Sequence, residues 1–497
     1  MSRETAKPNL IYIFADQLRY FSLGYAGDKR AQTPNIDAFQ AECTDLCQTV
    51  SGHPVCAPYR ASLFTGKYTT STGMVINEIR MNPNHHTFAD VLNENGYETA
   101  YIGKWHMYAA ELGNHYDPKN SYIPRGRDRL GFNGYFAGYN FRHEYSVGTA
   151  YYHLDSPEKI YYDKYEPDAQ VDMAVKQLER LKEGTSPFAL FLSIGTPHDP
   201  WIPENVPEEY LKKFADTQFE YPPNYLPDND PHADEWARLR EEERKELTEW
   251  MRVYYAMVAN LDDNMGRLFR EIRRLGLEEN SIVVFTSDHG EMFGAHGRRA
   301  KNIFYEEAIR VPMLMRWPGH LEKNAKRDCV VNTVDIMPTL LSLMGLPVPA
   351  GVEGTDLSRT VKDCESGVRN ESAIRKEPHT RENPEKPWEN GALLMCTGPT
   401  AAWGDGQEWR AYRTRRYKYA RYKSDGQEFL FDLEADPYEK NNLIGIPEFR
   451  ETEENMKKQM EEKMAAIGDH FENNTYYKEH WVEDRIIRRT ATIEGDT

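Results

Sequence analysis

Short apolar segments that stop abruptly at polar residues constrain the fold of this chain more than any other feature. Residues 9–15, NLIYIFA, are followed at once by Asp16 and Gln17. The same pattern recurs at 99–102 before Gly103 and Lys104, at 188–194 before Thr196, Pro197 and His198, and at 281–286 before Asp288 and His289. Such runs are typical of buried parallel strands whose carboxyl ends open on a site.

Helical patterns separate these strand-like runs. Apolar residues recur with helical spacing at 87–95 and 171–181, and most clearly at 254–275. This alternation predicts an α/β fold with a large, mostly parallel mixed sheet sandwiched by helices. Because open α/β sheets bind ligands outside the carboxyl ends of their strands, the polar clusters are expected to form one site. The irregular stretches 117–155 and 201–234 are predicted to cover it.

The chain changes character after about residue 360, where it becomes charged and rich in proline through Lys386. Beyond this segment, 409–423 and 428–433 have the pattern of antiparallel strands, and 451–467 that of a helix. A chain of 497 residues also exceeds the size of one hydrophobic core. We therefore expect an N-terminal catalytic domain, residues 1–365, and a smaller C-terminal α+β domain with an antiparallel sheet, residues 366–497.

Charge and composition exclude several classes of protein. The formal net charge of −18 argues against a nucleic-acid or anionic-membrane partner, because phosphate neutralisation needs a basic surface. The sequence has no apolar run of about 20 residues, and its first residues are too polar for a signal peptide. A cytoplasmic protein is expected from the sequence as written, and a periplasmic or secreted one if an export signal was trimmed. The six cysteines, among them Cys43 and Cys47, form neither a disulfide scaffold nor a paired zinc motif.

The stretch CAPYRASLFTGK begins at Cys56, and here the chain resembles the sulfatase family of the alkaline-phosphatase superfamily. The resemblance implies an alkaline-phosphatase-like fold and the oxidation of Cys56 to formylglycine by a separate maturation enzyme. By that resemblance, the hydrated aldehyde, a gem-diol, would attack sulfur and displace the alcohol of the ester to form a covalent hemiacetal sulfate. Its second hydroxyl would then expel sulfate by C–O cleavage, which divides one difficult hydrolysis into two steps. Arg60, one helical turn beyond Cys56, is expected to hydrogen-bond the gem-diol and hold it in line.

The resemblance also implies one divalent cation, which neutralises the sulfate oxygens. Its ligands would be Asp16, Gln17, Asp288, His289 and the modified Cys56. Oxygen ligands favour calcium, whereas the histidine nitrogen leaves manganese as the alternative. Many members of the family have two acidic residues at the first position and Asp-Asn at the second. The Asp-Gln and Asp-His pairs of this chain resemble the choline-sulfatase and phosphonate monoester hydrolase branches instead.

The remaining motifs supply positive charge. The segment GKWH at residues 103–106 resembles a family motif whose lysine and histidine, here Lys104 and His106, face the sulfate. His198 and Lys301 match further family positions. Together these residues would stabilise the sulfate oxygens, and either His106 or His198 would act as acid or base. The sequence does not decide which histidine has that task.

The substrate prediction rests on residues 133–153, which are dense in aromatic residues, glycine and asparagine. Aromatic faces beside polar groups suit a sugar ring, so we expect a sulfated carbohydrate, as in polysaccharide degradation, with Arg142 and His143 as contacts. Simple packing of the loop explains the aromatics equally well. The alternative functions are a phosphonate monoester or phosphodiester hydrolase, a choline-sulfatase and a non-catalytic binding homologue. The GKWH segment favours the sulfatase over the phosphonate hydrolase.

Overall fold

The structure, a computed structural model, describes residues 7–108, 115–362 and 390–488. A central sheet of eight strands has the order β10-β2-β9-β8-β1-β7-β3-β4. All neighbouring strands are parallel except β9, which is antiparallel to both β2 and β8. Its strands are β1 Asn9–Ala15, β2 Thr44–Val50, β3 Glu98–Lys104, β4 Phe136–Tyr139, β7 Phe188–Ile194, β8 Ser281–Ser287, β9 Met313–Arg316 and β10 Ala325–Asn332.

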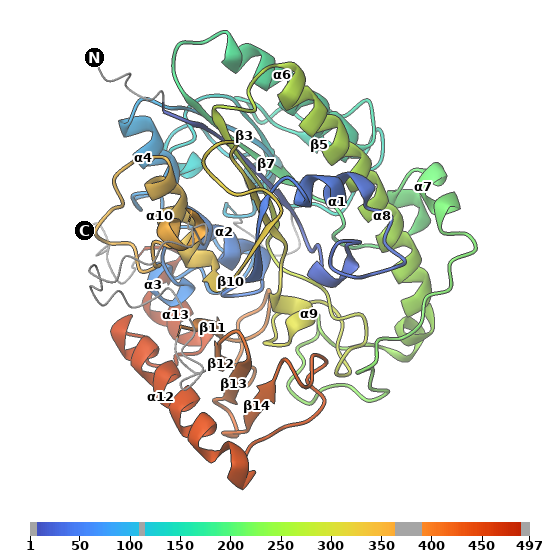
Figure 1. Cartoon of the computed structure of the whole chain (residues 1–497), viewed down its shortest axis with the longest axis vertical. Helices are drawn as coiled ribbons and strands as arrows, with labels where there is room; N and C mark the ends of the chain where they lie inside the picture. Colours follow the sequence, from blue (N-terminus) through green and yellow to red (C-terminus); the bar gives the residue numbers. More distant parts are fainter. Residues whose placement is uncertain (1–6, 109–114, 363–389, 489–497) are drawn as a thin grey trace.

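Helices cover both faces of this sheet (Figure 1). The main ones are α1 Pro34–Gln40, α2 Cys56–Thr65, α4 Phe88–Glu94, α6 Glu166–Lys182, α8 Glu241–Arg274 and α10 Thr333–Leu343. Shorter ones are α3 Thr69–Thr72, α5 Pro118–Ser121, α7 Glu208–Lys213, α9 Glu306–Ile309 and α11 Ser358–Lys362, with 3-10 turns η1 Tyr20–Ser22, η2 Arg127–Arg129 and η3 Pro203–Asn205. The predicted α/β fold, a mostly parallel mixed sheet between helices, is confirmed.

Side-chain alternation along β1 explains the two helical layers. Leu10, Tyr12 and Phe14 belong to the apolar cluster that includes α2, α4 and α10. Ile11 and Ile13 point to the opposite face and belong to the cluster of α1, α6 and α8. Successive side chains of a strand point to opposite faces, so a strand covered on both faces is apolar throughout. This is why β1 and β7 begin and end where their apolar runs do.

The structure corrects two details. Residues 136–139, within a predicted irregular stretch, form β4 and pair in parallel with β3 at the sheet edge. Their sequence, FAGY, is short and contains a glycine, so its strand preference is weak. The helix predicted over 254–275 begins earlier, as α8, at Glu241. Its first turns, EEERKELTEW, are highly charged and show little of the apolar periodicity used for the prediction.

A second, smaller sheet follows in the C-terminal part. It is antiparallel, with order β11-β12-β13-β14, and the helix predicted at 451–467 packs on it as α12. The elements of this part are β11 Ala392–Cys396, β12 Trp409–Arg413, β13 Tyr417–Tyr422, β14 Glu428–Asp432, η4 Pro447–Phe449, α12 Arg450–Ala466 and α13 Asn474–His480. Two-stranded ribbons complete the fold, β5 Tyr151–Tyr152 with β6 Ile160–Tyr161 and β15 Val482–Glu483 with β16 Ile486–Ile487. The predicted boundary at 365/366 lies outside the described residues.

Buried polar contacts join the small sheet to the large domain. Met395 N donates to Gly52 O at 2.9 Å, which attaches β11 to the segment just before α2. Glu306, at the start of α9, accepts from Arg413 at 2.9 Å and from Lys418 at 3.1 Å. All three charged side chains are almost completely buried. Burying charges without partners is costly, so this pairing fixes the small sheet against α9.

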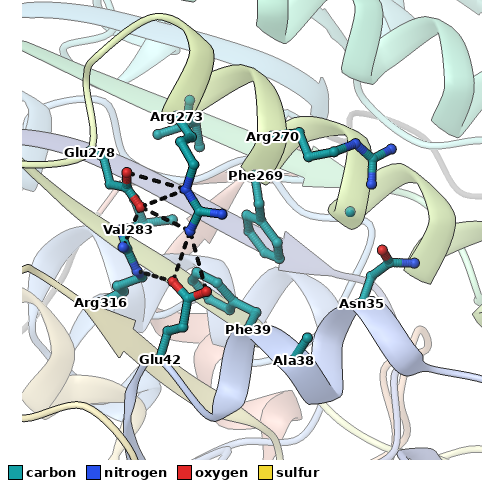
Figure 2. A pocket seen from close by; sticks show the side chains of 12 residues that line it. Asn35, Ala38, Phe39, Glu42, Phe269, Arg270, Arg273, Glu278, Val283 and Arg316 are labelled. Carbon is teal, nitrogen blue, oxygen red and sulfur yellow. Dashed lines mark hydrogen bonds and ion pairs between the residues drawn. The ribbon is translucent and has the colours of Figure 1, made fainter.

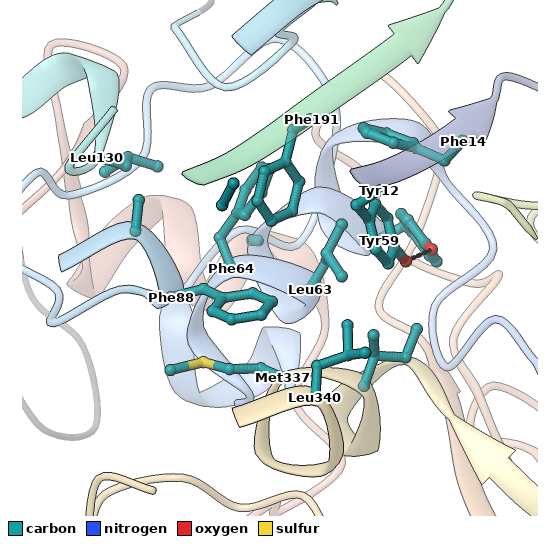
Figure 3. Close-up of a cluster of buried hydrophobic side chains, with 14 of the residues drawn as sticks. Tyr12, Phe14, Tyr59, Leu63, Phe64, Phe88, Leu130, Phe191, Met337 and Leu340 are labelled. Carbon is teal, nitrogen blue, oxygen red and sulfur yellow. Dashed lines mark hydrogen bonds between the residues drawn. The ribbon is translucent and has the colours of Figure 1, made fainter. Parts of the chain in front are cut away.

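Aromatic rings pack helix α2 against the sheet (Figure 3). Phe64, near the end of α2, has ring centroids of Phe132 at 5.4 Å, Phe191 at 5.7 Å and Trp105 at 5.9 Å. The side chain is fully buried. Because Cys56 is the first residue of the same helix, this packing also sets the position of Cys56 relative to the strand ends.

We expect Phe64→Ala to lower the free energy of unfolding by about 3–5 kcal/mol, since it removes a buried ring and leaves a cavity. The loss is measured by urea unfolding followed by circular dichroism. Tyr161→Ala is the control, because that side chain is 54% exposed and should change stability by less than about 0.5 kcal/mol. Equal losses in the two variants would contradict the packing described for α2.

Candidate active site

Two pairs of polar residues meet where neighbouring strands end. Asp16 and Gln17 follow β1, and Asp288 and His289 follow β8, whose last residue pairs with Ala15. Ligand atoms of Asp16, Cys56, Asp288 and His289 all lie within 4.8 Å of one another, and the four residues are buried. The parallel register therefore brings together residues more than 270 positions apart, as the strand-end pattern predicts.

Cys56 begins α2 and points at this group. Its Sγ lies 3.2 Å from His289 Nε2 and 3.6 Å from Asp16 Oδ1. Burial, and then the charge of Asp16, raise the pKa of the Cys56 thiol to about 11. An unmodified thiol here stays protonated at neutral pH and is a poor nucleophile, because the thiolate is the reactive form.

Basic side chains surround Asp16. Lys104 Nζ lies 2.7 Å and Arg60 3.2 Å from Asp16 Oδ2. Burial alone would raise the pKa of Asp16, but the nearby basic groups, Lys104 first, outweigh it and hold that pKa well below its usual range. Asp16 is therefore ionised. Arg60 also donates to Lys104 O at 2.6 Å and Ser193 Oγ at 2.8 Å, so its hydrogen bonds hold strand ends rather than Cys56.

Gly103 lets Lys104 reach this position. Gly103 has φ +107°, and a Cβ there would lie 1.9 Å from Ser193 O of the adjacent strand β7. A side chain at this point would push β3 away from β7. Glycine therefore belongs to the GKWH segment for a steric reason.

Lys301 connects three groups of the site. Its Nζ lies 3.4 Å from Cys56 Sγ, 3.0 Å from His198 Nε2 and 3.0 Å from Gln17 Oε1. Burial opposes its charge, yet Cys56 and Asp16 raise the pKa of Lys301. His198 Nδ1 lies 2.9 Å from Asp199 O, which leaves Nε2 as the acceptor facing Lys301. Burial, and then Lys301, lower the pKa of His198 well below its usual range, so the ring is neutral.

Asp288 is a carboxyl group whose charge is disfavoured by its surroundings. Burial, and then Asp16, raise the pKa of Asp288 to about 7. Its Oδ1 accepts from Gln17 N at 2.9 Å, whereas its buried Oδ2 has no hydrogen-bond partner. Two carboxyl groups at one dry point repel each other unless a positive charge lies between them. Carboxylate, amide and imidazole groups are a donor set that suits a divalent cation.

His106 lies beside the cluster and contacts residues that sequence reasoning did not single out. Its ring stacks on Phe141 at 4.4 Å, and its Nε2 lies 3.7 Å from Glu78, which also pairs with His115 at 2.8 Å. Burial, and then Lys104, lower the pKa of His106 to about 3. No motif surrounds Glu78 or His115 in the sequence, and only the folded chain brings them to His106.

The two predicted substrate contacts lie in different places. His143 packs against His198, with ring centroids 5.6 Å apart, and thus borders the cluster. Arg142 does not join it. The Arg142 side chain is completely buried, forms an ion pair with Glu166 and lies over the ring of Tyr139 at 3.9 Å. A guanidinium paired in this way holds the loop together and is not free to meet a ligand.

A pocket of about 150 Å³ lies elsewhere, between α1 and α8 (Figure 2). Two of its arginines are engaged in ion pairs: Arg273 lies 3.0 Å from Glu42, and Arg316 lies 2.9 Å from the same carboxylate. It shares no residue with the strand-end cluster. Within the described ranges, none of the helices combines the length and apolar character needed to span a bilayer.

The sheet thus carries carboxylates, lysines and a helix-initiating cysteine at the carboxyl ends of its strands, the arrangement that the strand-end motifs predict. A family model described as Sulfatase matches residues 8–346. The chain therefore belongs to the sulfatase family, as its motifs predict, and is a sulfuric ester hydrolase.

Named relatives agree with this assignment. The chain is 37% identical to an ulvan-active sulfatase of Formosa agariphila over 477 residues, covering 95% of this chain and 84% of the relative. It is 27% identical to an endo-4-O-sulfatase of Bacteroides thetaiotaomicron, covering 98% and 96%. Among solved structures, a protein in complex with its substrate D-glucosamine-2-N,6-O-disulfate matches with a TM-score of 0.75 at 22% identity, covering 93% and 99%. The last likeness concerns the fold alone.

Arg60→Met should lower the free energy of unfolding by about 3–5 kcal/mol in EDTA, because it removes the buried guanidinium that lies 3.2 Å from Asp16 and 3.8 Å from Asp288. Urea unfolding at pH 7 measures the loss. Arg416→Met breaks a partly exposed pair with Asp432 and should cost less than about 1 kcal/mol. A loss at Arg60 no larger than at Arg416 would show that Arg60 does not neutralise the two carboxylates.

Proposed function

We propose that this enzyme removes sulfate from a sulfated carbohydrate, using a formylglycine made from Cys56 and one divalent cation. The observation that carries the proposal is the position of Cys56 Sγ. This one atom lies 3.6 Å from a carboxylate of Asp16, 3.4 Å from Lys301 Nζ and 3.7 Å from Lys104 Nζ. A group at position 56 therefore faces both the cation ligands and two fixed positive charges.

Formylglycine supplies, as the aldehyde hydrate, an oxygen nucleophile that the thiol of Cys56 cannot match. The Sγ atom of Cys56 stands in for the oxygens of the hydrate. The groups that lie near Sγ are therefore the groups that we expect near those oxygens. The thiol pKa of about 11 supports this modification, since an unmodified Cys56 would be almost entirely protonated. The maturation enzyme that makes the modification is the protein partner this proposal requires.

Asp16, Gln17, Asp288 and His289 would hold the cation together with the modified Cys56. When bound, it supplies positive charge to the sulfate oxygens as the ester bond breaks. The unpartnered Oδ2 of Asp288 supports a cation at this point. Calcium is the proposed ion because most of the ligand atoms are oxygens, and manganese is the alternative because His289 offers nitrogen.

Lys104 and Lys301 would bind the sulfate oxygens opposite the cation. Fixed charges in a dry site stabilise developing charge more than the same charges in water. His198 is the proposed proton carrier, because its Nε2 and Cys56 Sγ are both bonded to Lys301 Nζ. The His106 ring instead contacts Glu78 and Phe141. We assign His106 the positioning of Lys104 and the loop beside it.

The carbohydrate assignment rests on two observations. Two relatives have names that specify a carbohydrate substrate: an ulvan-active sulfatase and an N-acetylglucosamine-6-O-sulfatase. In this chain, His143 and Phe141 border His198 at the edge of the site. An aromatic face beside an imidazole suits a sugar ring.

We expect Cys56→Ala to abolish sulfate release while substrate binding remains measurable, because the nucleophile is lost and the cationic groups stay. The matured enzyme and the variant are compared by sulfate release and by calorimetric binding of a sulfated oligosaccharide. Mass spectrometry of the peptide containing residue 56 tests the modification. Full activity in Cys56→Ala would refute the assigned nucleophile.

Defined sulfated mono- and oligosaccharides test the substrate class in the same assay. Choline sulfate, an aryl sulfate and a phosphonate monoester are the controls. Preference for a saccharide by at least about tenfold in kcat/KM, or about 1.4 kcal/mol, supports the proposal. A preference for choline sulfate or the phosphonate ester would move the enzyme to one of the other branches, and unconverted, inactive protein would favour a binding homologue.

Calcium should stabilise the EDTA-treated protein, because the ion binds the folded site and neutralises two buried carboxylates. A concentration 100-fold above the dissociation constant should add about 2.7 kcal/mol to the free energy of unfolding. Thermal unfolding with and without calcium measures the shift, with manganese in parallel. Asp288→Asn should reduce it. An unchanged unfolding temperature at millimolar calcium and manganese would exclude the proposed cation site.

A further inference from the structure

Glu291 lies behind the proposed cation ligands and belongs to none of the predicted motifs. It lies two positions after His289 and is fully buried. Its Oε2 accepts a hydrogen bond from Gln17 Nε2 at 2.6 Å. Its Oε1 accepts from Phe293 N at 3.1 Å and Ala300 N at 2.8 Å. All hydrogen bonds that the structure describes for this carboxylate therefore come from N–H donors.

The side-chain amide of Gln17 has an oxygen and an NH2 group, which exchange places when the amide rotates by half a turn. Nε2 donates to Glu291, and Oε1 accepts from Lys301 Nζ at 3.0 Å. Rotation of the amide by half a turn would place an NH2 group against the ammonium of Lys301 and an oxygen against the carboxylate of Glu291. The contact with Lys301 would then be repulsive, and the hydrogen bond from Gln17 Nε2 to Glu291 would be lost. Glu291 and Lys301 thus specify the same amide orientation.

The backbone of Gln17 is fixed independently. Its N–H donates to Asp288 Oδ1 at 2.9 Å, and its carbonyl accepts from Tyr254 Oη at 2.9 Å. Its φ of +66° is uncommon for a residue other than glycine, so surrounding contacts must hold it there. With N, O and Nε2 engaged in this way, Oε1 is the atom that Gln17 presents to the site.

Lys301 by itself would not hold the Gln17 amide in this orientation throughout a reaction. The proposed function assigns Lys301 to the sulfate oxygens and to His198, so its bond to Gln17 Oε1 competes with those contacts. Glu291 makes no contact with Cys56, Lys104 or His198 among the described residues, and its bond to Gln17 has no such competitor. Residues behind metal ligands commonly orient them in this manner.

We propose that Glu291 is a positioning residue that keeps the amide oxygen of Gln17, rather than its NH2 group, turned toward the cation. This inference rests on the proposed function, which makes Gln17 a cation ligand. The same carboxylate, through Phe293 N and Ala300 N, holds the loop that leads into Lys301. One buried side chain would thereby fix the cation side and the lysine side of the site together.

The test is a double-mutant cycle of Glu291→Gln and Gln17→Ala, read out as calcium affinity by calorimetry on EDTA-treated, desalted protein. Glu291→Gln keeps an oxygen for Phe293 N and Ala300 N but places NH2 against Gln17 Nε2. We expect each single variant to bind calcium about 10–100-fold more weakly. The double variant should bind no more weakly than Gln17→Ala alone, because Glu291 acts through Gln17.

Glu307→Gln is the matched control. Glu307 is also a buried glutamate, and its Oε1 accepts from Asn224 Nδ2 at 2.7 Å. Among the described residues, its side chain has no hydrogen bond to Gln17. It should leave calcium affinity within about threefold of the wild type, or about 0.7 kcal/mol, because the Glu307 side chain does not hold the Gln17 amide. If Glu291→Gln does not fold, Glu291→Asp repeats the cycle with the charge kept and Oε2 withdrawn from Gln17.

Two outcomes would overturn the inference. Wild-type affinity in Glu291→Gln would show that the amide needs no such support. Losses that multiply in the double variant would show that Glu291 acts through its charge or through the loop, not through Gln17. Either result leaves the proposed function intact if the wild type binds calcium and releases sulfate. A wild type that neither binds calcium nor releases sulfate would instead refute the proposed function.

Discussion

The two carboxyl groups at the ends of β1 and β8 impose the requirement on which the rest of the site depends. Asp16 and Asp288 are buried at one point, where their charges repel. Arg60 lies within 3.2 Å of one and 3.8 Å of the other, and Lys104 within 2.7 Å of Asp16. Asp288 Oδ2 nevertheless has no hydrogen-bond partner. The two strand ends, with Cys56 and His289, therefore bring together a set of side chains that could hold a metal ion.

The sheet and helix α2 make this arrangement rigid. Parallel pairing of β1 with β7 and β8 aligns strand ends, and the aromatic packing around Phe64 fixes the helix that begins at Cys56. The segment after β11 also contacts the residue next to Lys301, since Asn302 Nδ2 donates to Gly398 O at 3.0 Å. Charged groups held by such elements need little rearrangement when a charged ligand arrives, which is the condition for electrostatic catalysis.

Much of the site could be read from local sequence because strand ends are marked by abrupt changes from apolar to polar residues. Asp16, Lys104 and Asp288 each follow such a run, and the structure brings them to Cys56. The prediction for Arg142 rests on composition alone, and composition does not show in which direction a side chain points. In the structure the Arg142 side chain points inward and pairs with Glu166. Glu78 had no pattern to mark it, because only tertiary contacts give it a role beside His106.

The sequence by itself determined the α/β class, the strands that lie buried on both faces and the motif that identifies the family, since each depends on periodicity or spacing along the chain. It did not determine β4, which exists because the edge of β3 offers hydrogen bonds to a weak segment. Nor did it determine the orientation of Gln17 or the pairing of His198 with Lys301. Those depend on distances between residues far apart in sequence, which only the packed sheet sets.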